Sequence, residues 1–161
     1  MIGAVTTLKE LADREEQYMH ARLNEGKSVG PIIFIHFGNT SFVLPFKDPD
    51  ENREAYMKSV AISGIQEARK KRTFSHATTF SEAWVSMGKH LGTLSKVMRA
   101  SQDPDRIEAV VMQTWNADGK NILRIYRLVR DGDKTAIGDL LLSNEQGFET
   151  ESWLDPAFRP V

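Results

Sequence analysis

The chain has 161 residues, of which 40% are hydrophobic and 27% are charged, a composition that suits one globular domain. Its 21 lysines and arginines nearly balance 22 aspartates and glutamates, and the net charge of -1 makes a nucleic-acid partner unexpected. The chain has no cysteine, which excludes disulfides, thiolate catalysis and cysteine-ligated metal sites.

Nothing in the sequence indicates a membrane or an export route. The first residues lack the basic segment and apolar core of a secretory signal. The longest apolar runs, such as "PIIFIHF", are far shorter than the roughly 18 residues that span a bilayer. We therefore expect a cytoplasmic protein with no membrane contact.

The first half of the chain predicts a helix, a hairpin and a second helix. Residues 7–25 begin with the capping-box spacing of Thr7 and Glu10 and carry apolar residues at the helical period. Residues 32–46 are two β-rich runs around a Gly-Asn-Thr turn, which is typical of a hairpin. The second helix is expected to be capped by Asp48, with Pro49 in its first position and residues 69–72, "RKKR", in its last turn.

The second half predicts four strands. Residues 73–87 alternate as an extended strand, and residues 88–103 interrupt the pattern for long enough to form a mobile loop. Three strands follow, Ile107 to Trp115, Asn121 to Arg130 and Thr135 to Leu142, joined by tight turns that contain Asp-Gly.

This order, α-β-β-α-β-β-β-β, predicts an α+β fold in which two helices cover an antiparallel sheet. It is similar in architecture alone to profilin-like and roadblock-like domains. We expect a single domain over residues 1–142. The tail, residues 143–161, should pack through Trp153, Leu154 and Phe158 on the body or on a partner subunit.

A two-fold homodimer is expected, because the strands carry apolar residues on both faces while only two helices are available to cover them. A different protein partner is also compatible with this surface.

One face of the strand at residues 73–87 carries the candidate catalytic residues. Side chains at even separations share a face, which places His76, Glu82 and Trp84 together. If the next strand pairs antiparallel, Glu108 and the Asp103-Pro104-Asp105 turn can approach Glu82, and such carboxylates can hold a divalent cation or share a proton. The candidates are therefore His76, Glu82, Asp105 and Glu108.

A structural alternative explains the same carboxylates. Glu82 can pair with an arginine of a neighbouring strand, for which Arg106, Arg124 and Arg127 are available. We favour this interpretation, in which Glu82 is partly buried and bonded to an arginine rather than to a metal. The candidate binding residues are Trp84, Arg106 and Trp115, although tryptophans in strands are more often packing anchors.

Residues 81–120 carry a resemblance. "SEAWVSM" followed by "SQDPDRIEAVVMQTWNADGK" is similar to a pattern of small uncharacterised bacterial and phage proteins, an E-A-W strand followed by a P-D-R-x-E strand. The resemblance implies a recurring domain type of bacterial or phage origin, with no assigned activity. It transfers no catalytic residue. The positions that match are Glu82, Trp84, Pro104, Asp105, Arg106 and Glu108.

Two functions follow as hypotheses. The first is a non-enzymatic α+β module that self-associates or binds a partner, with no cofactor and no metal. The alternative is a hydrolase or phosphoesterase with a carboxylate-rich site near Glu82, Asp105 and Glu108, with or without a divalent metal. An enzyme needs these groups gathered around a cavity, whereas a module needs them paired with arginines.

Overall fold

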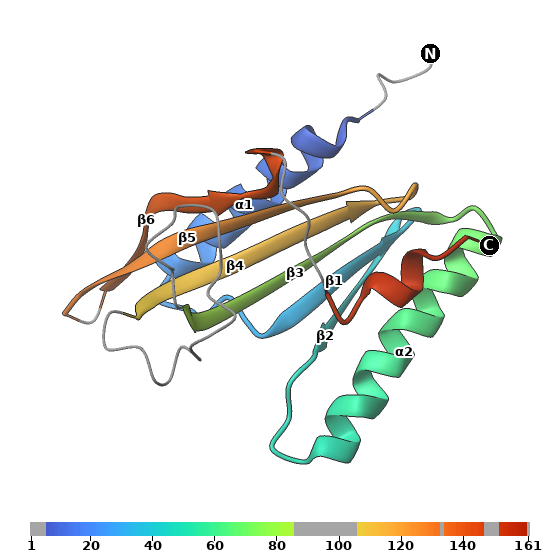
Figure 1. The fold of residues 1–161 in the computed structure, drawn as a ribbon, viewed down its shortest axis with the longest axis horizontal. Coiled ribbons are helices and arrows are strands. Elements are labelled where there is room, and N and C mark those ends of the chain that lie inside the picture. The colour runs from blue at the N-terminus through green and yellow to red at the C-terminus, as the bar shows by residue number, and fades with distance from the viewer. Residues whose placement is uncertain (1–5, 86–105, 133, 147–151, 161) are drawn as a thin grey trace.

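A computed structural model describes residues 6–85, 106–132, 134–146 and 152–160. They form an α+β fold of two α-helices and a six-stranded antiparallel sheet, in the predicted order (Figure 1). The elements are α1 (Leu8–Asn24), β1 (Ile32–Phe37), β2 (Thr40–Pro45), α2 (Glu51–Lys70), β3 (Phe74–Val85), β4 (Ile107–Asn116), β5 (Asn121–Asp131), β6 (Lys134–Ser143) and two 3-10 helices, η2 (Asn144–Gln146) and η3 (Asp155–Phe158).

The strands lie in the order β2-β1-β3-β4-β5-β6. Strands β1 and β2 form the predicted hairpin, and β3 to β6 form a meander. Strand β3 pairs with β1 rather than β2, so the connection through α2 passes over β1. This crossover covers one face of the sheet, while α1 covers the other (Figure 1).

Helix α1 lies across one face of the sheet because its apolar residues form a single stripe. The Thr7 hydroxyl caps the helix by accepting a hydrogen bond from the amide of Glu10 at 3.1 Å. Residues at helical spacing then pack on β3, β4 and β5, among them Ala12, Met19 and Leu23. The helix is therefore held by packing as well as by its cap.

Helix α2 begins two residues later than expected. Asp50, rather than Asp48, is the N-cap, because its Oδ1 accepts hydrogen bonds from the amides of Asn52 and Arg53 at 2.9 and 3.4 Å. The carboxylate of Asp48 instead accepts from the amide of Asp50 at 2.8 Å and shapes the turn before the helix. Pro49 therefore precedes the helix and does not occupy its first position.

The C-terminal tail contributes to the core of its own chain. Leu154 and Ala157 are fully buried in the cluster between α2 and the sheet. The rings of Trp115 and Phe158 stack with centroids 5.8 Å apart. Arg69 of α2 donates hydrogen bonds from Nη1 to the carbonyls of Ala157 and Arg159, at 3.1 and 2.8 Å.

Two further expectations concern a loop and the membrane. The loop expected at residues 88–103 lies outside the described residues. Among the residues that the structure does describe, no helix combines the length and the hydropathy needed to cross a membrane.

Candidate functional site

Three ionisable side chains converge between α1 and the sheet. Glu15 comes from the buried stripe of α1, His36 from the end of β1 and His76 from the start of β3. Oε1 of Glu15 lies 3.0 Å from Nε2 of His76 and 3.1 Å from Nε2 of His36. The side chains of Glu15 and His76 are almost fully buried, whereas that of His36 is 22% exposed.

The strand register brings the two histidines together. His36 and His76 are directly opposite each other in the β1-β3 ladder, and their rings stack with centroids 4.1 Å apart. Beyond this pair the register shifts between His36 and Phe37, which leaves Ser75 without a ladder partner. Because of this bulge, Phe74 turns into the core under α2 while His76 faces α1.

A serine holds the far nitrogen of each imidazole. Nδ1 of His36 shares a hydrogen bond of 2.7 Å with Oγ of Ser41 on β2, and Nδ1 of His76 shares one of 2.8 Å with Oγ of Ser75. These bonds fix the ring orientations, so that both Nε2 atoms point toward Glu15.

The two imidazoles also determine the protonation state of Glu15. Burial by itself raises the pKa of this carboxyl. The neighbouring His36 and His76 more than offset burial, and they lower the pKa of Glu15 to about 2. Glu15 is therefore a carboxylate at neutral pH, although it is buried.

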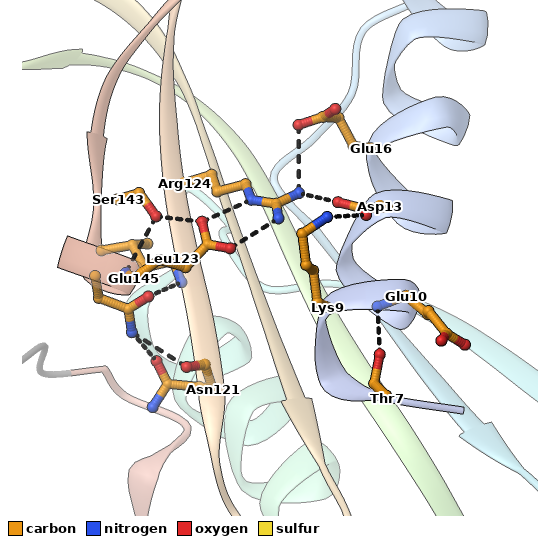
Figure 2. Close-up of polar contacts among 11 residues, drawn as sticks. Thr7, Lys9, Glu10, Asp13, Glu16, Asn121, Leu123, Arg124, Ser143 and Glu145 are labelled. Atoms are coloured by element: carbon orange, nitrogen blue, oxygen red, sulfur yellow. Dashed lines mark hydrogen bonds and ion pairs between the residues drawn. The ribbon is translucent and has the colours of Figure 1, made fainter. Parts of the chain in front are cut away.

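A second polar cluster ties α1 to the other half of the sheet (Figure 2). Arg124 of β5 is 6% exposed and donates from Nη1 to Oδ1 of Asp13 at 2.8 Å. Its Nη1 also lies 3.5 Å from Oε1 of Glu16, and its Nε and Nη2 bind the carboxylate of Glu145 in η2. Because every partner of this guanidinium in the cluster is a carboxylate, the cluster is a structural anchor rather than an open site.

Two of the predicted carboxylates, Glu82 and Glu108, lie toward the opposite end of β3 from His76. Glu108 is bound by Arg130, whose Nε lies 3.0 and 2.9 Å from its two carboxylate oxygens. Glu82 is half-buried, and it adds to the larger effect of Glu108 in raising the pKa of Arg130. Asp103 and Asp105 lie outside the described residues. The hydrolase hypothesis at Glu82, Asp105 and Glu108 stays a prediction.

Two of the arginines expected to pair with Glu82 are bound to other carboxylates. Arg124 is held by the acidic residues of α1 and η2, and Nε of Arg127 lies 3.3 Å from Oδ1 of Asp139 on β6. Arg130, which was not among the predicted partners, is close enough for Glu82 to contribute to raising the pKa of Arg130.

The candidate binding residues occupy different places. The guanidinium of Arg106 lies over the exposed ring of Trp84, 4.8 Å from its centroid, whereas Trp115 is buried in the core under α2. Two shallow pockets, of about 250 and 270 Å³, open beside Arg72 and beside Pro31. No candidate site residue is among the described residues that line them.

Of the three residues in the buried cluster, only His76 was predicted from the sequence. Both missed residues carried a signal: Glu15 interrupts an otherwise apolar stripe of α1, and His36 interrupts the apolar run "IIFIHF". A charged residue on a face that must be buried indicates a polar partner within the fold.

Comparisons with known proteins add no further assignment: no protein-family model, curated protein or solved structure matches the chain. The class of protein is therefore defined by its fold, an α+β protein with an antiparallel sheet between two helices. The resemblance of residues 81–120 to small bacterial and phage proteins stays a prediction.

Proposed function

We propose that the chain is a non-enzymatic module that binds a second copy of itself through the edge of its sheet at β2. The observation that carries this proposal is that the edge is apolar and exposed. Phe42 and Val43 are each 51% exposed, and the strand "TSFVLP" contains no charged side chain. Natural edge strands usually carry a charge or a bulge that prevents pairing, so an apolar edge favours an added strand.

Both faces of the β2 edge are apolar. Phe42 lies against the ring of Phe37 on the face that α2 covers, with ring centroids 5.5 Å apart. Val43 is opposite Phe34 of β1, on the other face. A second β2 strand would therefore bury apolar side chains on both sides of the sheet, in addition to forming backbone hydrogen bonds.

The outer flank of α2 carries two further exposed apolar side chains. Gln66 and Arg69 donate hydrogen bonds to η3, so their side of the helix faces the C-terminal tail. Val60 and Tyr56 project from the opposite flank at the helical spacing, and both are exposed. We define the β2 surface as Phe42, Val43, Tyr56 and Val60.

Charge complementarity favours a second copy as the occupant. Two antiparallel β2 strands related by a two-fold axis perpendicular to the sheet bring the two α2 helices side by side in opposite directions. The acidic start of one α2, with Asp50 and Glu51, would then face the basic end of the other, with Lys70 and Lys71. A parallel pairing, about a two-fold axis along the strands, would instead place the two α2 helices on opposite faces of the sheet and form no such contact.

The other edge of the sheet provides a matched control. Strand β6 also exposes an apolar residue, Leu140, but it carries Asp139 and Lys134, as protected edges do. Light scattering coupled to size exclusion should give a dimer mass for the wild type and for Leu140→Lys. Val43→Lys and Val60→Lys should both give a monomer mass with an unchanged circular dichroism spectrum. A monomer mass for the wild type across a wide concentration range would overturn the proposal.

A further inference from the structure

The buried cluster of Glu15, His36 and His76 has a feature that hydrogen bonding inside the protein leaves unexplained. Nε2 of His76 forms a hydrogen bond of 3.0 Å with Oε1 of Glu15. Nε2 of His36 is only 3.1 Å from the same oxygen, yet it is buried and has no hydrogen-bond partner among the described residues. Its approach to Glu15 is close, but its direction does not suit a hydrogen bond. An unpaired buried nitrogen is costly, which indicates that another group satisfies it.

The three side chains offer the ligand set of a first-row metal ion. Their donor atoms, one from each residue, lie within 4.8 Å of one another. Ligands at about 2.0–2.2 Å from a tetrahedral zinc ion lie about 3.3 Å apart, so the two separations of 3.0 and 3.1 Å from Oε1 need only small shifts. Two imidazoles and one carboxylate favour zinc and its first-row neighbours over magnesium or calcium, which prefer oxygen ligands alone.

The surroundings have the second layer of contacts that metal sites require. Ser41 and Ser75 each hold the Nδ1 atom of one histidine, which leaves both Nε2 atoms directed at the same space. Glu15 offers a carboxylate oxygen to the same space and so can supply the negative charge that a divalent cation needs. Ladder pairing between β1 and β3 fixes both histidines before any ion binds.

We propose that Glu15, His36 and His76 bind one divalent first-row transition-metal ion, with Zn²⁺ as the best fit, and that this ion fastens α1 to strands β1 and β3. The three proposed ligands are not part of the β2 surface, and no catalytic step is assigned to the site. Three protein ligands leave a fourth position of a tetrahedral ion open. The exposed part of His36 marks the side from which water or a small ligand would reach that position.

Titration calorimetry and thermal unfolding test the site with Zn²⁺ and Co²⁺ added to the chelator-treated protein. We expect one ion per chain, and a rise in Tm of about 5–10 °C when the free metal exceeds its Kd by 100-fold. Co²⁺ should give the visible absorption of a tetrahedral complex. Ser41→Ala should weaken binding by about 10-fold, because it releases the His36 ring.

Matched variants separate this site from binding at other side chains. His36→Ala and Glu15→Gln should lower the affinity at least 100-fold, whereas His20→Ala, which removes an exposed histidine of α1, should leave it unchanged. If Glu15→Gln does not fold, the partly exposed His36 still provides the test. Wild-type protein that binds neither ion, or His36→Ala protein that binds as tightly as the wild type, would overturn the proposal.

Discussion

Arg124 of β5 holds Glu145 of η2 in a two-pronged ion pair, with Nε 3.2 Å from Oε2 and Nη2 3.1 Å from Oε1 (Figure 2). The remaining nitrogen of the same guanidinium binds Asp13 of α1. One buried arginine therefore joins the first helix, the fifth strand and the segment after the sixth strand. Because these elements are far apart in the sequence, the contact forms only in the folded chain.

Removal of this arginine should destabilise the protein strongly. In Arg124→Met, the carboxylates of Asp13, Glu16 and Glu145 lose their shared cation and repel one another. We expect a loss of about 2 kcal/mol in the free energy of unfolding, less than for a fully buried pair, because the three carboxylates left behind are partly exposed. Arg127→Met is the control, because Arg127 and Asp139 form an exposed pair that contributes about 0–1 kcal/mol. Urea unfolding that gave equal losses for the two variants would contradict the role of Arg124.

The same contacts predict how stability depends on pH. Hydrogen bonds from Lys9 and Arg124 lower the pKa of Asp13, and those from Arg124 lower the pKa of Glu145. A lowered pKa in the folded state adds stability above the ordinary values of 3.8 and 4.5, and this stability is lost as the pH falls through the folded pKa. The Tm of the wild type should therefore fall as the pH drops below about 4.5.

Arg124→Met gives the comparison for this pH dependence. Its Tm should be lower at neutral pH and should change less on acidification, since Asp13 and Glu145 then have more ordinary pKa values. Glu108 and Arg130 remain paired in both proteins and contribute equally. Melting curves that stay parallel from pH 7 to pH 3 would argue against the Arg124 cluster as the origin of the effect.

The sequence predicted those parts of the fold that depend on local patterns. Tight Asp-Gly turns and alternating strands gave the β4-β5-β6 meander, and the Thr7 cap gave the start of α1. The cap of α2 was misplaced because Asp48 and Asp50 flank the same proline. Only the backbone geometry decides which carboxylate reaches the helical amides.

The polar contacts were harder to predict because they depend on which elements lie side by side. Arg124 was offered as a partner for Glu82, but β4 separates β3 from β5, and Arg124 instead meets two acidic residues of α1 and one of η2. His36 and Glu15 were not considered, because the pairing of β1 with β3 and the position of α1 over that pair are long-range features. The sequence pointed to Glu15 and His36 only as polar residues within otherwise apolar faces.

Gly64 in the middle of α2 should be a site at which stability increases. A methyl group added there would meet no atom within 4 Å, and the helical backbone suits alanine. Gly64→Ala should raise the free energy of unfolding by about 0.5–1 kcal/mol, because glycine loses more backbone entropy in a helix. Gly30→Ala is the counterpart: its methyl group would collide with the carbonyl of Phe80 and should lower stability. Urea unfolding of both variants at one protein concentration measures these changes. A loss of stability in Gly64→Ala would contradict the open space beside the helix.

The burial of Leu154 predicts that the C-terminal tail is part of the folded core. Its side chain is fully buried in the cluster that α2 forms with β1, β3 and η3. Leu154→Ala should therefore lower the free energy of unfolding by about 2–5 kcal/mol, because it leaves a cavity as well as removing apolar contact. Leu140→Ala removes the same atoms from an exposed position on β6 and should cost far less. If urea unfolding gave similar small losses for both leucines, the tail would not contribute to the stability of its own chain. If the stability lost in Leu154→Ala varied with protein concentration, and that lost in Leu140→Ala did not, the tail would instead pack on a partner subunit.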